Sequence, residues 1–281
     1  MEAVLLQHEP WVRAAAFAAV LLAMALWELL APRRILAYPR ILRWPANLGI
    51  VLLNTALLRL ALPMAAVGLA AAASEGGWGL LNQLDLPPWL ALAAAVLALD
   101  LVIYVQHVLF HAVPALWRLH RMHHADLDFD VTTGTRFHPL EILLSAGIKL
   151  GAVAALGPSA LAVLVFEVLL NATAMFNHGN VRLPVAADRW LRWLVVTPDM
   201  HRVHHSVVPA ETSRNFGFSL PWWDRLFGTY LAQPAAGHER MAIGVPEFRD
   251  AAELRLHRML LQPLRDVVRL GGPDPGVLKA R

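Results

Sequence analysis

The sequence predicts an all-α fold: a polytopic membrane bundle of about four spans or hairpins with a helical, histidine-rich cap on its cytosolic side. Three observations predict it. Of the 281 residues, 57% are apolar and the mean hydropathy is positive, which favours a lipid solvent. The apolar residues fall in blocks near the ~20 residues that a spanning helix needs. Most histidines lie at or beyond the ends of these blocks.

The first two apolar blocks cover residues 11–31 and 47–73. The first block is long enough to span, has no basic segment before it and lacks a clear small-residue cleavage site. We therefore expect a retained helix rather than a cleaved signal peptide. The second block is interrupted by Arg59 and Pro63 but is otherwise continuous, so it is expected to form the second span.

The third and fourth blocks flank the first histidines. Residues 87–105 form the third block, which continues into the histidine region without a helix breaker until Pro114. The fourth, 140–176, is divided by Gly157 and Pro158. This division predicts a helical hairpin whose arms are each near the lower length limit for a span.

Loop charges predict the orientation of these spans. The loop after the first block contains four arginines, Arg33, Arg34, Arg40 and Arg43. The loop after the second block contains two acids, Glu75 and Asp85, and no basic residue. By the positive-inside rule the first loop is cytosolic. The third span then returns to the cytosol and the hairpin re-enters, so all histidine clusters are expected on the cytosolic face.

Three regions are expected along the chain. Residues 1–94 would form N-terminal transmembrane helices, and 95–250 a catalytic domain that includes the membrane hairpin. Residues 251–281 would form a C-terminal tail with an interfacial helix, because mixed apolar and basic residues cover 249–270.

Composition excludes some classes of site. The chain has 24 basic and 21 acidic residues, a balance too even to indicate nucleic-acid binding. It has no cysteine, which excludes disulfides, iron–sulfur clusters and thiolate metal sites within this chain. Any metal must be held by His, Asp or Glu.

The histidines form ordered clusters. Ten of the thirteen lie from His107 to His205, and eight of these ten form one HxxxH pair (HVLFH) and two HxxHH motifs (HRMHH and HRVHH). Residues three and four apart share a helix face, so each motif would point two or three imidazoles to one side. Eight histidines are too many for one ion, and two ions are the economical interpretation. Iron, zinc, copper and nickel all accept imidazole, so ligand type alone does not select the metal.

An acid precedes the first histidine pair on the same helix face. Asp100, Tyr104, His107 and His111 recur at i, i+4, i+7 and i+11. A carboxylate within a membrane helix is costly unless it is paired. We therefore expect Asp100 to orient a ligand histidine through its second ring nitrogen.

The order HVLFH, LHRMHH and MHRVHH, with eight residues between His111 and His120, resembles the fatty acid hydroxylase and sterol desaturase superfamily. Further matching segments are RFHPLE (136–141), FNHGNVRLP (176–184), TPDMHRVHHS (197–206) and WDRLFGTY (223–230). The resemblance covers about residues 95–250 and is greatest to bacterial members. It implies a di-iron enzyme that uses O2 to hydroxylate or desaturate a C–H bond of a lipid.

The resemblance also implies a set of site residues. It assigns eight metal ligands and a ninth in the FNHGN segment: His107, His111, His120, His123, His124, His201, His204 and His205, with His178. His138 either ligates the metal or caps a helix. Asn180, Asp199 and Asp224 are expected beside the ligands, although a helix N-cap explains Asp199 better. No catalytic residue beyond the ligands is predicted.

The cofactors implied are two iron ions, with O2 as co-substrate. Electrons would come from a separate electron-transfer protein or a reduced pterin, because the chain has no GxGxxG motif and no cytochrome b5-like HPGG segment. The lipid substrate would enter from the bilayer of a bacterial inner membrane, with the active site on the cytosolic side. Neither the lipid nor the oligomeric state is predicted.

Two other functions use the same residues. A zinc-dependent membrane hydrolase would work without oxygen or a reductant. A metal-binding or metal-transporting membrane protein would usually place its ligands near the midplane of several spans, whereas these histidines lie past the expected membrane ends.

Overall fold

The computed structural model describes residues 2–62 and 65–265, which form helices joined by loops, with no β-strand among them. The helices are α1 (Glu2–Gln7), α2 (Glu9–Leu30), α3 (Arg40–Ala61), α4 (Ala65–Gly76), η1 (Leu80–Gln83), α5 (Pro88–Ala112), α6 (Pro114–His124), η2 (Thr133–Thr135), α7 (Pro139–Leu156), α8 (Ala160–Asn177), α9 (Val185–Leu191), α10 (Pro198–His204), α11 (Pro209–Thr212), α12 (Trp222–Leu226), η3 (Ala251–Leu254), α13 (Leu256–Leu261) and η4 (Gln262–Leu264).

Five segments are long and apolar enough to cross a membrane, judged by length and composition, and one of them runs across residues 63–64, which lie outside the described ranges. They are α2, the stretch Arg40–Gln83, α5, α7 and α8. This confirms the predicted polytopic helical fold. The division of the fourth block is also as predicted, because Gly157 ends α7 in the left-handed conformation (φ 60°) and Ser159 caps α8 by accepting a hydrogen bond from the Ala162 N–H at 3.2 Å.

The second block differs from the prediction. It contains two helices, since α3 ends at Ala61 and α4 begins at Ala65. The sequence gives the reason: Pro63 lacks an N–H and its ring clashes with the preceding turn of a continuing helix.

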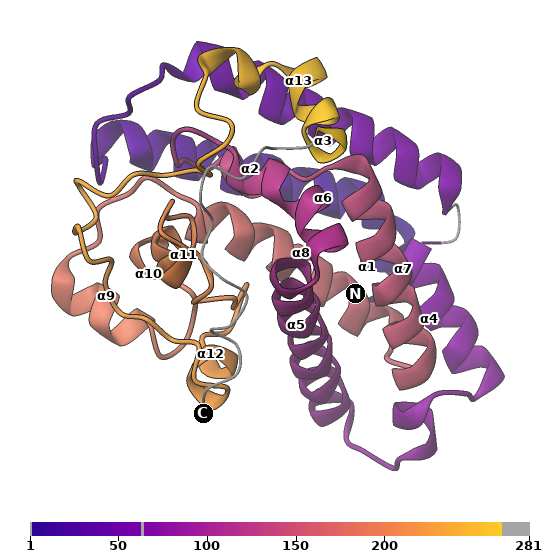
Figure 1. Ribbon diagram of the computed structural model, residues 1–281. Helices are drawn as coiled ribbons and strands as arrows, with labels where there is room; N and C mark the ends of the chain where they lie inside the picture. Colours follow the sequence, from indigo (N-terminus) through magenta and orange to yellow (C-terminus); the bar gives the residue numbers. More distant parts are fainter. Residues whose placement is uncertain (1, 63–64, 266–281) are drawn as a thin grey trace.

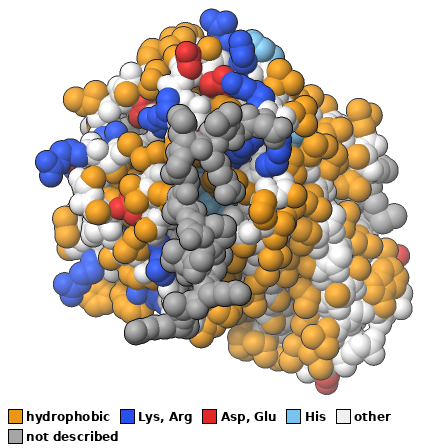
Figure 2. Space-filling model, in the orientation of Figure 1, with side chains coloured by type: hydrophobic (Ala, Val, Ile, Leu, Met, Phe, Trp, Pro, Cys, Tyr) orange, Lys and Arg blue, Asp and Glu red, His pale blue; other side chains and the backbone are white. Residues whose placement is uncertain are grey.

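Helix α8 is the centre of the bundle and packs against α2, α4 and α5. Of its most apolar window, 44% is buried, compared with 11% for that of α2, which lies at the periphery. Figure 1 shows α9 to α12 gathered on one side of α5 and α8, with α4 and α7 on the other. In Figure 2, hydrophobic side chains dominate the surface over α4 and α7, as expected for a surface in contact with lipid.

The long helices present one end each to a common region, formed by the loop 125–137 and the cap, residues 178–265. Helices α2, α5 and α8 end there, and α3 and α7 begin there. Glu28, near the end of α2, accepts backbone N–H bonds from Val131 in the loop (2.7 Å) and Asn180 in the cap (2.9 Å). The histidine motifs at these ends therefore lie on the same side of the bundle.

The loop arginines that suggested the orientation fasten this region together. Arg43 is buried at the start of α3, where it contacts Asp126 at 2.8 Å. Arg40 pairs with Glu28 at 3.3 Å. These side chains bind acids of the chain itself.

The expected interfacial helix over 249–270 is not one helix in its described part. Residues 251–264 form three short helices, η3, α13 and η4. They pack against α3 and α6, and Arg121 of α6 donates to the Gln262 carbonyl at 2.7 Å. Pro263 prevents a longer helix here. Residues 266–281, part of the same prediction, lie outside the described residues.

Candidate metal centre

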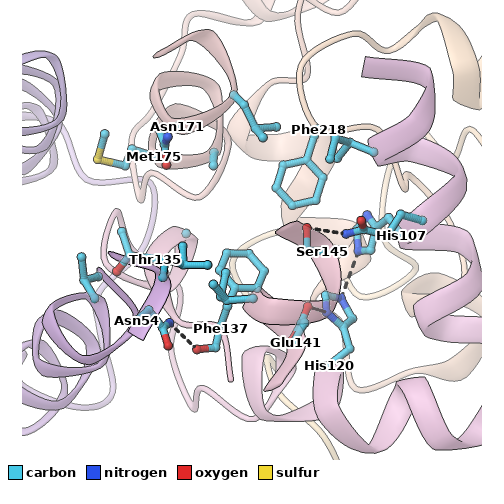
Figure 3. A pocket seen from close by; sticks show the side chains of 18 of the residues that line it. Asn54, His107, His120, Thr135, Phe137, Glu141, Ser145, Asn171, Met175 and Phe218 are labelled. Atoms are coloured by element: carbon cyan, nitrogen blue, oxygen red, sulfur yellow. Dashed lines mark hydrogen bonds and ion pairs between the residues drawn. The ribbon is translucent and has the colours of Figure 1, made fainter. Parts of the chain in front are cut away.

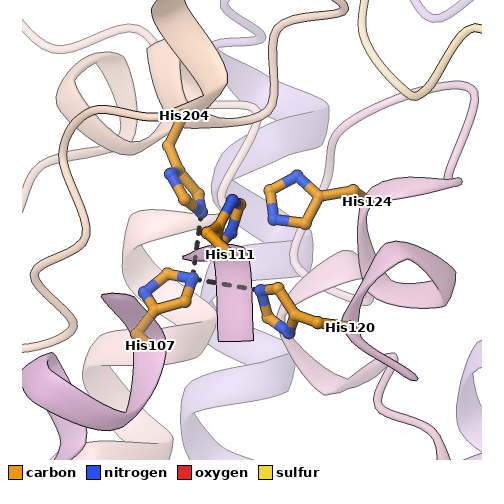
Figure 4. Close-up of side chains that lie close together, drawn as sticks. All are labelled: His107, His111, His120, His124 and His204. Atoms are coloured by element: carbon orange, nitrogen blue, oxygen red, sulfur yellow. Dashed lines mark hydrogen bonds between the residues drawn. The ribbon is translucent and has the colours of Figure 1, made fainter. Parts of the chain in front are cut away.

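The nine histidines proposed as ligands lie together in two groups. Within each group, one ring nitrogen of every histidine lies within 4.8 Å of those of the others. The five-histidine group, drawn in Figure 4, contains His107, His111, His120, His124 and His204. The four-histidine group contains His123, His178, His201 and His205.

Helical spacing explains how the motifs divide between the groups. In α6, His120 and His124 are one turn apart and enter the five-histidine group, whereas His123 points to the other. The second HxxHH motif, at α10, divides the opposite way. His201 and His205 enter the four-histidine group, and His204 enters the five-histidine group.

The ring nitrogens are arranged with Nδ1 outward and Nε2 inward. Five histidines use Nδ1 to contact an oxygen of the surrounding chain: His107 with Phe216 O (2.6 Å), His120 with Glu141 Oε1 (2.7 Å), His123 with Arg136 O (3.1 Å), His178 with Ala174 O (2.7 Å) and His204 with Arg214 O (2.8 Å). An oxygen partner fixes the tautomer with the proton on Nδ1. The Nε2 lone pairs therefore face one another inside each group.

The distances between the inward nitrogens fit a bound cation. The Nε2 atom of His107 lies 3.1 Å from that of His120 and 3.0 Å from that of His204. In the other group, the Nε2 of His178 lies 3.1 Å from that of His205. Two lone pairs at this separation repel each other without a positive charge between them. Metal–nitrogen bonds of about 2.1 Å at right angles would separate the nitrogens by roughly 3.0 Å.

Buried nitrogen atoms without partners support the same interpretation. The Nε2 of His111 and both ring nitrogens of His124 are buried with no hydrogen-bond partner among the described residues. Burial, with a smaller effect of neighbouring His120, lowers the pKa of His204 to about 3. Burial also lowers the pKa of His178 to about 3. Neutral imidazole is the form that binds metal, so the donor set fits two metal ions.

Glu141 is a site residue that the sequence interpretation did not single out. Its Oε1 accepts the bond from His120 Nδ1, and the side chain is buried in the first turn of α7. A carboxylate behind a metal-binding histidine fixes the ring and raises its basicity. The sequence did contain a signal for this role: Glu141 is an acid at the start of an apolar block, two residues after the pair His138-Pro139.

The prediction that Asp100 orients a histidine is wrong. Its carboxylate instead accepts bonds from the indole N–H of Trp223 (2.8 Å) and the Leu220 N–H (3.3 Å), and so holds α12 and the loop before it against α5. The outward nitrogen of His107 meets a backbone carbonyl, that of Phe216. A carbonyl partner cannot be recognised from residue type.

Asp224, expected beside the histidines, contacts the backbone next to His107 rather than an imidazole. It accepts the N–H groups of Phe216 and Gly217, both at 2.8 Å. The Phe216 carbonyl in turn accepts the bond from His107. Asp224 therefore positions the peptide that orients this histidine.

The other candidates have structural contacts away from the nine histidines. His138 belongs to neither group; its Nδ1 accepts from the Leu140 N–H at 3.2 Å and so caps α7. The Asn180 side chain contacts the backbone of Arg34 through both its oxygen and its nitrogen (3.1 and 2.8 Å). Asn180 fastens the loop after α2 to the cap.

Asp199 is not the N-cap of α10, contrary to the favoured interpretation. Thr197 takes that position and accepts from the Met200 N–H. Asp199 instead pairs with Arg33 at 3.1 Å and with Arg202. Burial raises the pKa of Asp199, but the charges of these neighbours outweigh it and lower the pKa below its ordinary value.

His238 is buried above this pair, with its Nε2 3.6 Å from Asp199. Burial lowers the pKa of His238 to about 4. Asp199 opposes this shift, whereas the charges of Arg202, Arg33 and Arg192 add to it. His238 is therefore neutral at pH 7.

A buried ionic network holds the loop that follows the first HxxHH motif. Arg43 makes two bonds of 2.8 Å to the carboxylate of Asp126, and it also contacts Asp130 and Thr133. Both acids and the guanidinium are fully buried. Thr133 donates to Asp126 as well, at 2.8 Å. The path of the loop is thus fixed by charge-assisted bonds to α3.

A cavity of about 240 Å³ opens beside the five-histidine group. His107 and His120 line one end, and the walls come from α2, α3, α5, α7 and α8. Most wall residues are apolar, including Phe137 and Phe218, which are drawn in Figure 3. A hydrophobic ligand inside the bundle would therefore lie against two of the histidines.

Comparisons with known proteins point to one family. A family model described as fatty acid hydroxylase matches residues 92–229. The chain is 31% identical to an ornithine lipid hydroxylase of Rhizobium tropici over 132 residues, 47% of this chain and 39% of that protein. It is 28% identical to the alkylglycerol monooxygenase of Homo sapiens over 151 residues, 52% of this chain and 32% of that protein. These alignments cover well under half of each relative. No solved structure matches the chain.

Proposed function

This chain belongs to the fatty acid hydroxylase and sterol desaturase superfamily, and we propose that it is a membrane-bound di-iron oxygenase that inserts oxygen into a C–H bond of a lipid. The observation that carries the proposal is a mostly apolar cavity within the long helices that reaches His107 and His120 of the five-histidine group, while the four-histidine group provides a second set of ligands for a metal ion. The relatives named as a lipid hydroxylase and a monooxygenase favour hydroxylation over desaturation.

The residues that would hold the two ions are the nine histidines, five around one ion and four around the other. Bound iron would supply the activation of O2 that attack on an unactivated C–H bond requires. The protein keeps the imidazoles neutral by burial and fixes their rings through Nδ1 contacts. Neutral ligands hold two metals without adding negative charge to a buried site.

The cavity would bind the lipid chain and exclude water from the reacting carbon. Its wall helices are the candidate membrane spans, so we propose that the substrate enters laterally from the bilayer. Loop charges support a cytosolic position for the histidine groups in a bacterial inner membrane. A separate electron-transfer protein or a reduced pterin would supply electrons.

The test compares the lipids of cells that express the wild type, His204→Ala or His138→Ala, grown with isotopically labelled O2. His138 is the matched control because it is buried near α7 but belongs to neither group. We expect a labelled lipid product with the wild type and His138→Ala and none with His204→Ala. Formation of the same product without oxygen would refute the proposal and favour a hydrolytic enzyme.

Metal analysis of the purified wild type is the second readout. Two ions per chain, identified as iron, are expected. A value near one ion would refute the two-site arrangement, and zinc in place of iron would refute the oxygenase.

A further inference from the structure

The cavity beside the five-histidine group contains three buried hydrogen-bond acceptors without partners. They are Asn54 Oδ1 from α3, Gln106 Oε1 from α5 and Glu141 Oε2 from α7. Asn54 and Glu141 are 7% and 4% exposed, so bulk water does not solvate them. Figure 3 shows Asn54 and Glu141 among the side chains around this cavity, with His120 beside Glu141.

The neighbouring contacts show why the free atoms are acceptors. The amide nitrogen of Asn54 donates to the Phe137 carbonyl at 2.9 Å, which leaves its oxygen free. The amide nitrogen of Gln106 donates to Ser145 Oγ at 3.0 Å. The first oxygen of Glu141 accepts from His120. In each case the donor or one oxygen is used within the protein and an acceptor remains.

We propose that the substrate lipid has hydroxyl or amide N–H groups close to the carbon that is oxidised, and that these groups donate to Asn54, Gln106 and Glu141. The inference rests on the proposed function and narrows its substrate class. A buried acceptor is expensive unless a donor reaches it, and the rest of the wall is mostly apolar. A plain hydrocarbon chain would leave all three acceptors unpaired.

The position of the acceptors also predicts which carbon reacts. The Gln106 side chain is bonded to Ser145, which lies one turn along α7 from Glu141, and Glu141 contacts His120, so two of the acceptors lie at the histidine end of the cavity. A donor held there places its neighbouring carbons against the five-histidine group. Oxidation is therefore expected within a few bonds of the donor group, and the end of the alkyl chain is expected to remain intact.

The test uses two probes with the same skeleton: a long-chain monoalkylglycerol, which has two hydroxyl donors, and its dimethyl ether, in which two methyl groups replace the hydroxyl hydrogens and no donor remains. Binding to the purified metal-loaded protein is measured by the rise in Tm with probe concentration. We expect the diol to bind about tenfold more tightly than the ether, as one or two neutral hydrogen bonds would give. Equal binding would overturn the inference and indicate that water satisfies the acceptors.

Single substitutions in the cavity test which residues cause the preference for the diol. Gln106→Leu and Asn54→Leu each replace the amide, and with it the acceptor, by an apolar side chain of similar branching, and Leu58→Met is the control because Leu58 lines the same cavity without a polar group. The preference for the diol should fall about threefold or more in each acceptor variant and persist in Leu58→Met. A preference unchanged in both acceptor variants would overturn the inference. Glu141 is not substituted because it also holds His120.

Binding and turnover separate this inference from the proposed function. If the diol binds preferentially but no lipid is ever oxidised, the oxygenase proposal fails, and only the binding of donor-bearing lipids by the three acceptors remains supported. If the ether is oxidised as efficiently as the diol, the inference fails and the oxygenase stands.

Discussion

Replacing Arg43 by methionine should destabilise the protein more than any change at a surface ion pair. Arg43 is fully buried and contacts two buried carboxylates, Asp126 and Asp130. Methionine fills much of the same volume but leaves both carboxylates without their cation. Removal of one partner from a buried pair costs about 3–5 kcal/mol, mainly because the remaining charge is uncompensated. This corresponds to a fall in Tm of roughly 6–20 °C.

The measurement is thermal unfolding of the purified protein in detergent, with Arg182→Met as the matched control. Arg182 makes a salt bridge to Glu239 at 3.5 Å in which both side chains are about two-thirds exposed (63% and 66%). Such a pair contributes about 0–1 kcal/mol, so the control should change Tm by no more than about 4 °C. Adding Asp126→Asn and Asp130→Asn to Arg43→Met should recover part of the loss. If Arg43→Met and Arg182→Met unfold at the same temperature, the network does not hold the loop as described.

Three further predictions concern single side chains. Glu141→Ala should lower metal content or product formation about 10–100-fold, and Glu141→Gln less, because the amide oxygen still accepts from His120; metal analysis and product assays measure both. His138→Ala should cost about 1 kcal/mol through loss of the α7 cap while metal content is retained, and loss of metal would contradict its position outside both groups. His238 has a folded pKa of about 4, below the ~6.5 of an unfolded histidine, so the unfolded state binds more protons between these values. Its contribution is present above about pH 6.5 and is lost as the pH falls, so the wild type should lose Tm faster than His238→Gln between about pH 7 and 5, and parallel curves would contradict this.

Much of this fold could be predicted because its signals are local. Apolar length gave the candidate spans, and Gly157 gave the hairpin turn because only a flexible residue adopts its left-handed conformation readily. Spacing within the two HxxHH motifs brought the histidines to common helix faces. The grouping of all nine follows from these faces and from the shared end of the long helices.

The parts that could not be predicted depend on contacts distant in sequence. Asp100 has the helical spacing to contact His107, but its carboxylate accepts a hydrogen bond from the indole of Trp223, 123 residues later in the sequence. The partner of His107 is a backbone carbonyl, which every residue has. Glu141 was missed for the converse reason: its role appears only when the start of α7 lies against His120 in α6.

The crossed division of the two HxxHH motifs has a consequence for metal loading. Helix α6 gives two imidazoles to the five-histidine group and one to the four-histidine group, and the α10 motif does the reverse. An ion bound in either group would therefore order both helices and place most of the ligands of the second site. Most of the conformational entropy of these helices would then be lost when the first ion binds, and little more when the second ion binds. Binding of the first ion should therefore raise the affinity for the second, and the form with a single ion should be scarce during a metal titration. By the same coupling, removal of one ion by a chelator should weaken the binding of the other.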